Sequence, residues 1–337
     1  MGRSLLMLYT GGTLGMVPGP NGLVPGHQLD ERLPAQLAQL PSTRQHALPD
    51  WRLDTTATPI DSSSATPSDW LTLIARIRTY ARDPDLSGIV VLHGTDTMAW
   101  CSAMLSVWLS GHVSCPIVVT GAQLPLEAEG SDALPNIELA MRYAVHPSAM
   151  GVTLAFGGRV LGGDAARKWY TEDHLGFETP NDRPLLNWPL SQRDRHPLPT
   201  PHRHQISAAR RRVEAALSIE SVSLALPAKL PRLARIVLWP GIMACHVSAL
   251  LTHADVALLE VWGSGNLPDD PALHDVLAQA SHSGKRLIAL SQCPHGSTHI
   301  GVYAAGNALK AAGIIEGETL TPELASALLL AAPRPAP

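Results

Sequence analysis

The chain has few charged residues for its length of 337 residues. Aspartate, glutamate, lysine and arginine make up 16% of it, against about 25% in an average globular protein. A surface this poor in charge is typical of a protein that buries part of its surface between subunits. The 25 basic and 29 acidic residues leave a net charge of −4. This balance excludes the basic surface that nucleic-acid or membrane-surface binding requires, so we expect neither partner.

Cysteines and long apolar segments are also scarce. Cys101, Cys115, Cys245 and Cys293 are far apart and form no Cys-x-x-Cys pair, which is typical of a reducing compartment. No stretch approaches the roughly 18 apolar residues of a transmembrane helix, and the first residues lack the pattern of a signal peptide. We therefore expect a soluble, cytoplasmic protein.

Lysine is rare among the basic residues. There are only four lysines, and Lys168 is the only one in the first 228 residues. Arginine can replace lysine on a surface, but its guanidinium stays protonated and does not act as a base. Lys168 is therefore a candidate for chemistry that needs an amine; the alternative is an ordinary surface lysine.

Short apolar strands alternate with helical patterns in the first part of the chain. This alternation predicts a larger N-terminal, doubly wound α/β sheet domain over residues 1–190. Strands are expected at residues 4–9, 88–92, 116–120 and 151–156, and helices at 68–80 and from the turn after residue 97 to about 109.

A stretch rich in proline, histidine and arginine follows, and we predict a linker region over residues 191–230. A smaller C-terminal α/β domain is expected over residues 231–337. Its predicted strands are 235–240, 256–261 and 286–290, and its predicted helices are 269–282, 302–312 and one that includes 248–252.

Two threonine-bearing turns follow predicted strands, Thr10–Gly15 and His93–Thr97. In open α/β sheets, ligands bind beyond the carboxyl ends of the strands. The Thr13 hydroxyl, flanked by backbone N–H groups, suits a nucleophile beside an oxyanion site, although glycines also serve plain turns. Thr95 next to Asp96 can bind an ammonium group and relay a proton, or simply cap a helix.

Several other kinds of site are disfavoured. The chain has no Gly-x-Gly-x-x-Gly fingerprint, no phosphate-binding loop ending in Gly-Lys-Ser/Thr and no Gly-x-Ser-x-Gly elbow, which argues against nucleotide binding and an ordinary serine hydrolase. Cys293, His295 and His299 are residue types that bind metals, but they lack a paired ligand spacing. We therefore expect no metal.

Taken together, the motifs resemble the L-asparaginases of the bacterial type, specifically the cytoplasmic type I branch. The resemblance implies a two-domain α/β amidohydrolase, active as a homodimer or homotetramer, without a metal or organic cofactor. It runs from residue 4 to about residue 320. The matching segments are Tyr9–Met16, Asp61–Ser63, His93–Ala99, Val119–Pro125, Lys168, Gly263–Asn266 and Tyr303–Leu309.

The resemblance also implies the catalytic roles. Thr13 is expected to attack the side-chain amide of L-asparagine and form an acyl-enzyme, with the oxyanion held by backbone N–H groups near Gly12 and Thr95. Thr95, Asp96 and Lys168 are expected to form a relay in which an uncharged Lys168 takes the proton of Thr95.

Further residues are implied for substrate binding. Ser62 and Ser63 are expected to receive the α-carboxylate, and the Asp96 carboxylate to meet the α-ammonium group. Asn266, from the C-terminal domain, is expected to complete the site of a neighbouring subunit.

The sequence departs from the family pattern on the lid that follows the first glycine turn. The family has a tyrosine there that helps to activate the nucleophile, and this chain has Leu23. Two alternatives therefore stay open beside asparagine hydrolysis: a glutaminase or hydrolase of another small amide, and a catalytically weak amino-acid-binding homologue.

A second departure concerns allosteric control. In type I enzymes the allosteric asparagine site uses a threonine and an arginine at the positions of Arg167 and Glu260. Cys293 does match the family pattern. We predict that this control is lost or altered.

Overall fold

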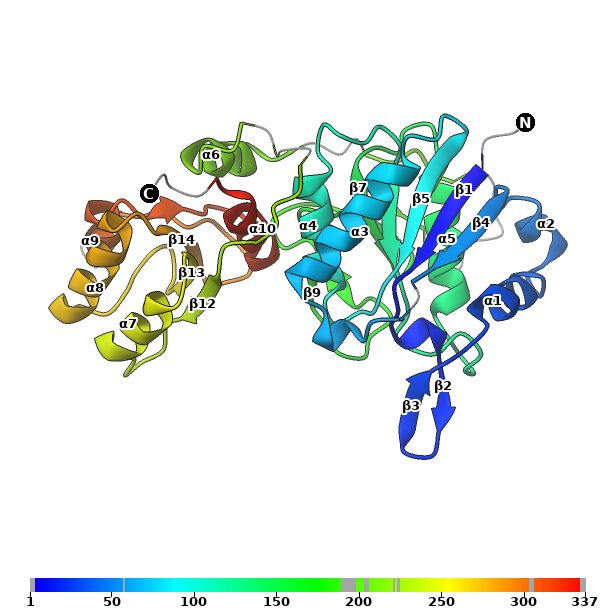
Figure 1. Cartoon of the computed structure of the whole chain (residues 1–337), viewed down its shortest axis with the longest axis horizontal. Coiled ribbons are helices and arrows are strands. Elements are labelled where there is room, and N and C mark those ends of the chain that lie inside the picture. Colours follow the sequence, from blue (N-terminus) through cyan, green and yellow to red (C-terminus); the bar gives the residue numbers. More distant parts are fainter. Residues whose placement is uncertain are drawn as a thin grey trace. The chain divides into compact units, whose positions relative to one another are not determined.

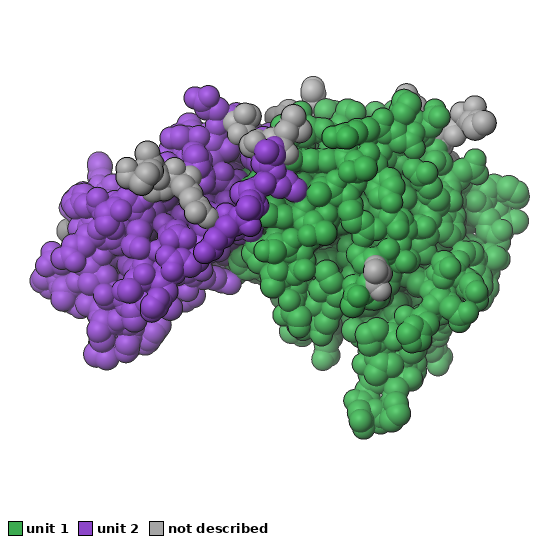
Figure 2. All heavy atoms as spheres, in the orientation of Figure 1, with its two compact units in different colours: residues 1–204 green, residues 205–337 purple. Residues whose placement is uncertain are grey.

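The computed structural model describes residues 4–56, 58–188, 198–202, 206–220, 222, 225–302 and 306–333. The chain forms two compact units, Met1–His204 and Gln205–Pro337, coloured separately in Figure 2. The division between them falls inside the stretch that we expected to be a linker, residues 191–230.

The first unit is built on a seven-stranded sheet with the order β11-β8-β7-β6-β5-β1-β4 (Figure 1). Five neighbouring strands, β4, β1, β5, β6 and β7, run parallel, and β8 and β11 pair antiparallel with their neighbours. The strands are β1 (Ser4–Tyr9), β4 (Trp51–Thr55), β5 (Leu86–Leu92), β6 (Ile117–Thr120), β7 (Val152–Phe156), β8 (Arg159–Gly162) and β11 (Leu186–Asn187).

Helices cover both faces of this sheet. In Figure 1, α3 (Pro67–Tyr80) and α4 (Met98–Trp108) lie on one face. The core on the other face joins alternate residues of β1 and β5 to α1 (Leu29–Leu37) and α5 (Ala133–Ala144). Because both faces are buried, the central strands are continuous apolar runs. The predicted doubly wound domain and its four strands are confirmed.

Helix α3 shows how local sequence signals set an element's start. Asp69 accepts a hydrogen bond from the Thr66 backbone N–H at 2.8 Å, and Pro67 occupies the first turn, where it loses no helical hydrogen bond. Trp70, Ile74 and Ile77 face the interior. The helix thus begins one residue before the predicted 68–80.

The second unit contains a smaller sheet of four parallel strands in the order β12-β13-β14-β15, which confirms the smaller C-terminal α/β domain. Its strands are β12 (Leu233–Val237), β13 (Val256–Val261), β14 (Arg286–Ser291) and β15 (Ile315–Glu316). Its helices are α6 (Ala208–Ala216), α7 (Ala244–Thr252), α8 (Pro271–His282), α9 (Asn307–Ala311) and α10 (Pro322–Ala331).

Three expectations for this part of the chain need correction. The strand predicted at 235–240 ends at Val237, because the chain turns where the Ile242 N–H bonds to the Trp239 carbonyl at 3.0 Å. The helix predicted from residue 302 begins only at Asn307, and 303–305, the start of the Tyr303–Leu309 motif, lie outside the described residues.

The third correction is helix α6, which lies within the expected linker. It begins where the Ser207 hydroxyl accepts a hydrogen bond from the Arg210 N–H at 3.1 Å, and Val213 anchors it by burial. A serine cap followed by alanines and arginines is a helix-start signal that we did not use.

The remaining elements are short. They include the hairpin of β2 (Met16–Gly19) and β3 (Gly22–Pro25), the hairpin of β9 (Arg167–Lys168) and β10 (Phe177–Glu178), and helix α2 (Ser42–Gln45). Within the described part of the chain, no helix combines the length and apolar character needed to cross a membrane.

Candidate active site

The two threonine-bearing turns meet because their strands are neighbours. In the parallel pair of β1 and β5, Tyr9 lies beside Leu92, and the Thr10 N–H donates to the Leu92 carbonyl at 3.0 Å. Both strands therefore end side by side. The turn after each begins at the ligand-binding edge of the sheet.

Glycines let these turns touch. Gly12 has a φ of 99°, and a Cβ on it would lie 2.4 Å from the Gly94 Cα. Such a distance leaves no room for any side chain, so both the backbone angle and the contact require glycine. The contact places the short 3-10 turn Thr13–Gly15 directly beside the turn that carries Thr95.

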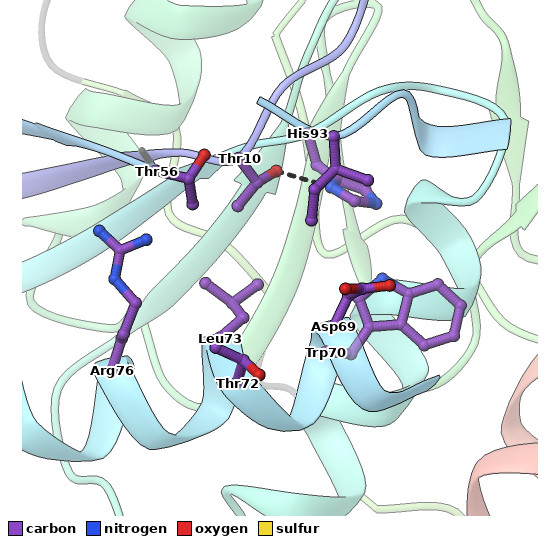
Figure 3. Close-up of a pocket in the computed structure, with 9 residues that line it drawn as sticks. Thr10, Thr56, Asp69, Trp70, Thr72, Leu73, Arg76 and His93 are labelled. Atoms are coloured by element: carbon purple, nitrogen blue, oxygen red, sulfur yellow. Dashed lines mark hydrogen bonds between the residues drawn. The ribbon is translucent and has the colours of Figure 1, made fainter. Parts of the chain in front are cut away.

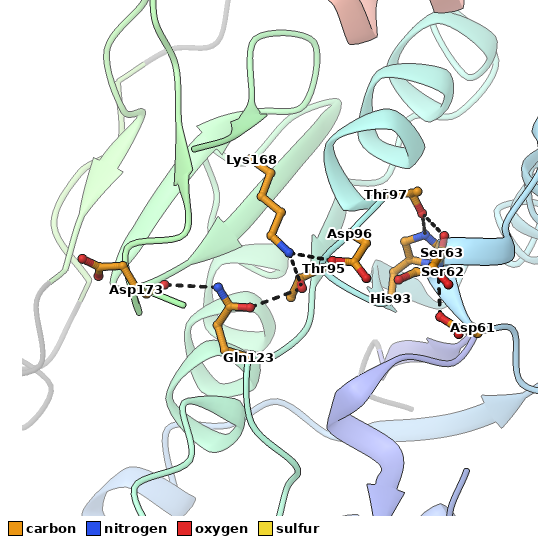
Figure 4. A network of polar contacts seen from close by, with 10 residues as sticks. All are labelled: Asp61, Ser62, Ser63, His93, Thr95, Asp96, Thr97, Gln123, Lys168 and Asp173. Atoms are coloured by element: carbon orange, nitrogen blue, oxygen red, sulfur yellow. Dashed lines mark hydrogen bonds and ion pairs between the residues drawn. The ribbon is translucent and has the colours of Figure 1, made fainter. Parts of the chain in front are cut away.

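Lys168 joins the second turn from β9 (Figure 4). Its Nζ lies 3.0 Å from the Thr95 Oγ1 and 2.8 Å from the Asp96 Oδ1. The Thr95 residue is only 6% exposed, whereas the Asp96 side chain is 60% exposed. The structure thus brings three predicted site residues into one hydrogen-bonded group, with the carboxylate facing solvent.

Gln123 is a second partner of Thr95 to which we assigned no role. The Thr95 hydroxyl donates to the Gln123 Oε1 at 3.3 Å, and the Gln123 Nε2 donates to the Asp173 carbonyl at 3.3 Å (Figure 4). Its backbone N–H is held by the buried Asp132 carboxylate at 3.0 Å. Its place after β6, beside the two threonine turns, was the available signal.

Thr13 differs from Thr95 in having no polar partner among the residues that the structure describes. It is half-buried, and none of the described residues forms a hydrogen bond with its hydroxyl. Leu23, which the resemblance aligns with a lid tyrosine, lies on the exposed strand β3 and is 48% exposed. The Tyr9 hydroxyl lies against Gly15, two residues further along the turn.

Ser62 and Ser63 form a 3-10 segment next to the second turn. The Ser62 hydroxyl packs against Gly94, since a Cβ there would lie 2.3 Å from its Oγ, and the residue is 4% exposed. The Thr97 hydroxyl donates to the Ser62 carbonyl at 2.8 Å. Ser63 is exposed, and its N–H donates to the Asp61 carboxylate at 3.0 Å.

A buried histidine, His93, links the two turns through its two ring nitrogens. The His93 Nδ1 lies 2.7 Å from the Thr10 hydroxyl, and its Nε2 lies 3.3 Å from the Thr97 hydroxyl. Burial lowers the pKa of His93 from 6.5 to about 4, because an interior disfavours the charged ring. His93 is therefore a neutral bridge at neutral pH.

A groove of about 430 Å³, partly open to solvent, lies between α3 and the ends of β1, β4 and β5 (Figure 3). Its walls include Thr10, Thr56, Trp70, Leu73, Arg76 and His93. None of the predicted site residues lines it, although Thr10 and His93 lead directly into the two threonine turns.

Asn266 lies in the second unit, in the turn where Trp262 and Asn266 form an isolated bridge. Its Oδ1 is buried, and no hydrogen-bond partner is found for it in the described part of the chain. The other predicted site residues, Gly12 included, belong to the first unit.

The two positions that depart from the allosteric pattern have partners of their own. The Glu260 carboxylate is buried and accepts a hydrogen bond from the Arg235 Nη2 at 3.2 Å; this contact raises the pKa of Arg235. The Arg167 guanidinium lies 6.0 Å from the Trp169 ring centroid. The loss of allosteric control stays a prediction.

No cluster of three or more histidine, cysteine, aspartate or glutamate side chains suited to a metal ion occurs among the residues that the structure describes. Cys293, His295 and His299, considered above, therefore do not converge on one point.

The fold and the site define a two-domain α/β protein with paired threonine turns at the ends of adjacent parallel strands. The chain belongs to the asparaginase family: the model for "Asparaginase, N-terminal" matches residues 4–196, and the model for "Glutaminase/Asparaginase C-terminal domain" matches residues 232–334. The resemblance found in the sequence is confirmed.

Individual relatives are similar over nearly the whole of this chain. L-asparaginase 1 of Escherichia coli is 34% identical over 325 residues, which cover 95% of this chain and 89% of that protein. The 60 kDa lysophospholipase of Mus musculus is 31% identical over 97% of this chain and 58% of its own length. The crystal structure of L-asparaginase I from Vibrio cholerae superposes with a TM-score of 0.76 at 29% identity, covering 98% and 92% of the two chains.

Proposed function

We propose that this chain is an amidohydrolase that converts L-asparagine to L-aspartate and ammonia. The observation that carries the proposal is the placement of the Lys168 amine, 3.0 Å from the Thr95 hydroxyl and 2.8 Å from the Asp96 carboxylate. A lysine in contact with a buried hydroxyl can exchange a proton with it. The similarity to L-asparaginase 1 supports asparagine as the substrate.

In the first half of the reaction, the Thr13 hydroxyl attacks the side-chain amide carbon of the substrate. The new C–O bond forms as the carbonyl oxygen becomes an oxyanion, held by backbone N–H groups near Gly12 and Thr95. The C–N bond then breaks, and ammonia leaves with the proton that Thr13 gave up. The product of this half is an ester on Thr13.

In the second half, water replaces Thr13. Lys168 accepts the proton of Thr95, and Thr95 in turn takes a proton from the attacking water. The ester bond breaks, aspartate is released, and the proton returns to Thr13. Because Lys168 already contacts Thr95, this transfer needs no large rearrangement of either side chain.

Recognition of the amino-acid end falls to groups at the same edge of the sheet. Asp96 contacts Lys168 through Oδ1, and its exposed carboxylate is free to bind the α-ammonium group as well. Ser62 and Ser63, across Gly94 from the relay, are assigned to the α-carboxylate.

A second candidate function has its own supporting observation. Leu23 has no hydroxyl, and within the described residues Thr13 has no partner that could take its proton. A protein that binds a small amino acid with little turnover would have this arrangement, and hydrolysis of glutamine or another small amide remains open for the same reason.

We also propose that the active form is a homodimer or homotetramer in which Asn266 completes a neighbouring site. The buried, unpaired Oδ1 of Asn266 supports this, because an isolated buried acceptor is costly unless a partner reaches it. Sedimentation of the wild type should give an oligomer, and Asn266→Ala should keep that size while losing activity.

The four free cysteines support a reducing, cytoplasmic setting.

The decisive experiment measures ammonia release from L-asparagine and L-glutamine by the purified protein. Thr13→Ala is the test variant, and Thr79→Ala, on the exposed face of α3, is its control. Release from asparagine that disappears only in Thr13→Ala supports the proposal. No release, with calorimetric binding of asparagine or aspartate, supports the binding protein instead. Silence in both assays rejects both.

A further inference from the structure

We propose that Arg32, in helix α1, is a positioning residue that clamps the turn carrying Thr13 between the lid hairpin β2–β3 and the loop after β6. This inference deepens the proposed function, because the reaction of Thr13 is one of its two readouts. Arg32 was not among the residues selected from the sequence.

The clamp begins at the end of the Thr13–Gly15 turn. The Gly15 carbonyl accepts a hydrogen bond from the Arg32 Nη1 at 3.0 Å and another from the Gly26 N–H at 3.1 Å. Gly15 directly precedes β2 and Gly26 directly follows β3. Arg32 therefore binds at the point where both ends of the hairpin meet the nucleophile turn.

The other side of the guanidinium is fixed by a carboxylate. The Arg32 Nε and Nη2 donate to the two oxygens of Glu127 at 2.8 and 2.6 Å. Next to it, the Leu126 N–H donates to the Leu14 carbonyl at 3.0 Å. The loop after β6 thus holds the nucleophile turn twice, once directly and once through Arg32.

Gly26 shows that the hairpin is shaped around this side chain. A Cβ on Gly26 would lie 2.4 Å from the Arg32 Nη1 and 2.5 Å from the Gly15 oxygen. These are closer than non-bonded atoms can approach, so any side chain at Gly26 would push the guanidinium or the turn away. A planar guanidinium can bind Glu127 and Gly15 together, which an ammonium on a flexible stem cannot reproduce.

The clamp has a direct consequence for the chemistry. On one side the turn rests against Gly94 through Gly12, and on the other it is held by Arg32. A loosened turn would move the Thr13 hydroxyl relative to Lys168. A shift of about 1 Å at a reacting atom costs up to roughly 100-fold in rate. Since Arg32 does not contact Ser62 or Asp96, the loss should appear in kcat and leave KM nearly unchanged.

The experiment compares three variants with one control by ammonia release from asparagine, with the thermal unfolding midpoint measured for each. Arg32→Met should lower kcat about tenfold to 100-fold with KM within about threefold. Arg32→Lys should lie between Arg32→Met and the wild type. Glu127→Gln, which leaves the Gly15 contact in place, should lower kcat about threefold. The control is Arg52→Met, which removes an exposed ion pair with Asp83 far from the turn in sequence.

A second readout does not depend on activity. Hydrogen exchange of the Gly26 amide, which bonds to Gly15, should be faster in Arg32→Met and unchanged in Arg52→Met. Unchanged exchange overturns the clamp, as does an unchanged kcat in an active protein. A rise in KM equal to the fall in kcat also overturns it. If the wild type hydrolyses no amide, the proposed function fails, and exchange alone decides whether the clamp exists.

Discussion

The two threonine turns lie against each other, but the hydroxyl groups of Thr13 and Thr95 differ in their burial and in their hydrogen-bond partners. The Thr95 hydroxyl is buried and contacts both Lys168 and Gln123. Thr13 is half-buried, and its hydroxyl has no partner within the described residues. The turn that follows it is nevertheless held, because Leu126 donates to the Leu14 carbonyl, and Gly26 and Arg32 donate to the Gly15 carbonyl.

This difference indicates how much of the proposed reaction would be prepared by folding. The hydrogen-bonded group around Thr95 is already assembled, so the proposed relay would carry no cost of assembly during the reaction. For Thr13, folding fixes the position of the turn, but none of the described residues contacts its hydroxyl as a base. The resemblance places such a group, a tyrosine, on the lid, where this chain has Leu23.

The largest expected effect comes from removing Lys168 from its hydrogen-bonded group with Thr95 and Asp96. Lys168→Met should lower kcat on asparagine about 1,000-fold, because it removes the amine that we propose takes the proton of Thr95. Steady-state kinetics will measure this, with Lys310→Met, at an exposed position of α9, as the control. More than a tenth of the wild-type kcat in Lys168→Met would show that another group is the base.

The next largest effect concerns His93, the buried histidine that contacts Thr10 in the first turn and Thr97 in the second. The pKa of His93 is lowered from 6.5 to about 4, so between these pH values the unfolded chain binds a proton that the folded protein excludes. The free energy of unfolding should therefore fall as the pH falls from 6.5 to 4, by about 3 kcal/mol in total.

Urea unfolding at several pH values measures this term. His93→Gln, which cannot titrate, provides the control, and the difference between the two proteins isolates the histidine. A difference that stays constant from pH 7 to pH 4.5 would contradict the neutral bridge.

A smaller effect concerns the link from His93 to the first turn. Thr10→Val should lower the free energy of unfolding by about 1–2 kcal/mol, because it leaves the buried His93 Nδ1 without its partner at 2.7 Å. Urea unfolding at pH 7 is again the measurement. Thr72→Val, exposed on α3, is the matched control; equal values for the two variants would show that the link contributes nothing.

The smallest expected effect concerns Thr13, whose hydroxyl has no partner within the described residues. Leu23→Tyr should raise kcat about fivefold, roughly 1 kcal/mol in the barrier, if a hydroxyl near Thr13 limits turnover. Leu23→Phe supplies the ring without the hydroxyl and should give no gain. A correctly folded Leu23→Tyr with unchanged kcat would place the limitation elsewhere.

The fold was predictable where one local signal was strong. Continuous apolar runs indicated β1, β5, β6 and β7, because parallel strands buried on both faces have no polar side. The linker was less predictable, since a serine cap and a few buried residues were enough to form α6. The end of β12 was also predicted too late, because the apolar residues of the sequence continue past Val237 into the turn at Trp239.

The site was only partly predictable for a different reason. Threonine, aspartate and lysine were recognisable by type, but Lys168 lies 73 residues from Thr95 in the sequence and occupies a two-residue strand with no pattern of its own. Gln123 had only its place after β6 as a signal, and Arg32 had none, because glutamine and arginine are common at surfaces. Only their contacts distinguish them.

The sequence by itself determined which strands are buried, which turns require glycine and which side chains can act as nucleophile, acid or base. These properties depend on a residue and its near neighbours. Tertiary structure alone decided that Lys168 reaches Thr95, that Gln123 is its second partner and that Arg32 holds the Thr13 turn. Hydrogen bonds act over about 3 Å, and only strand register and helix packing bring residues so distant in the chain within that range.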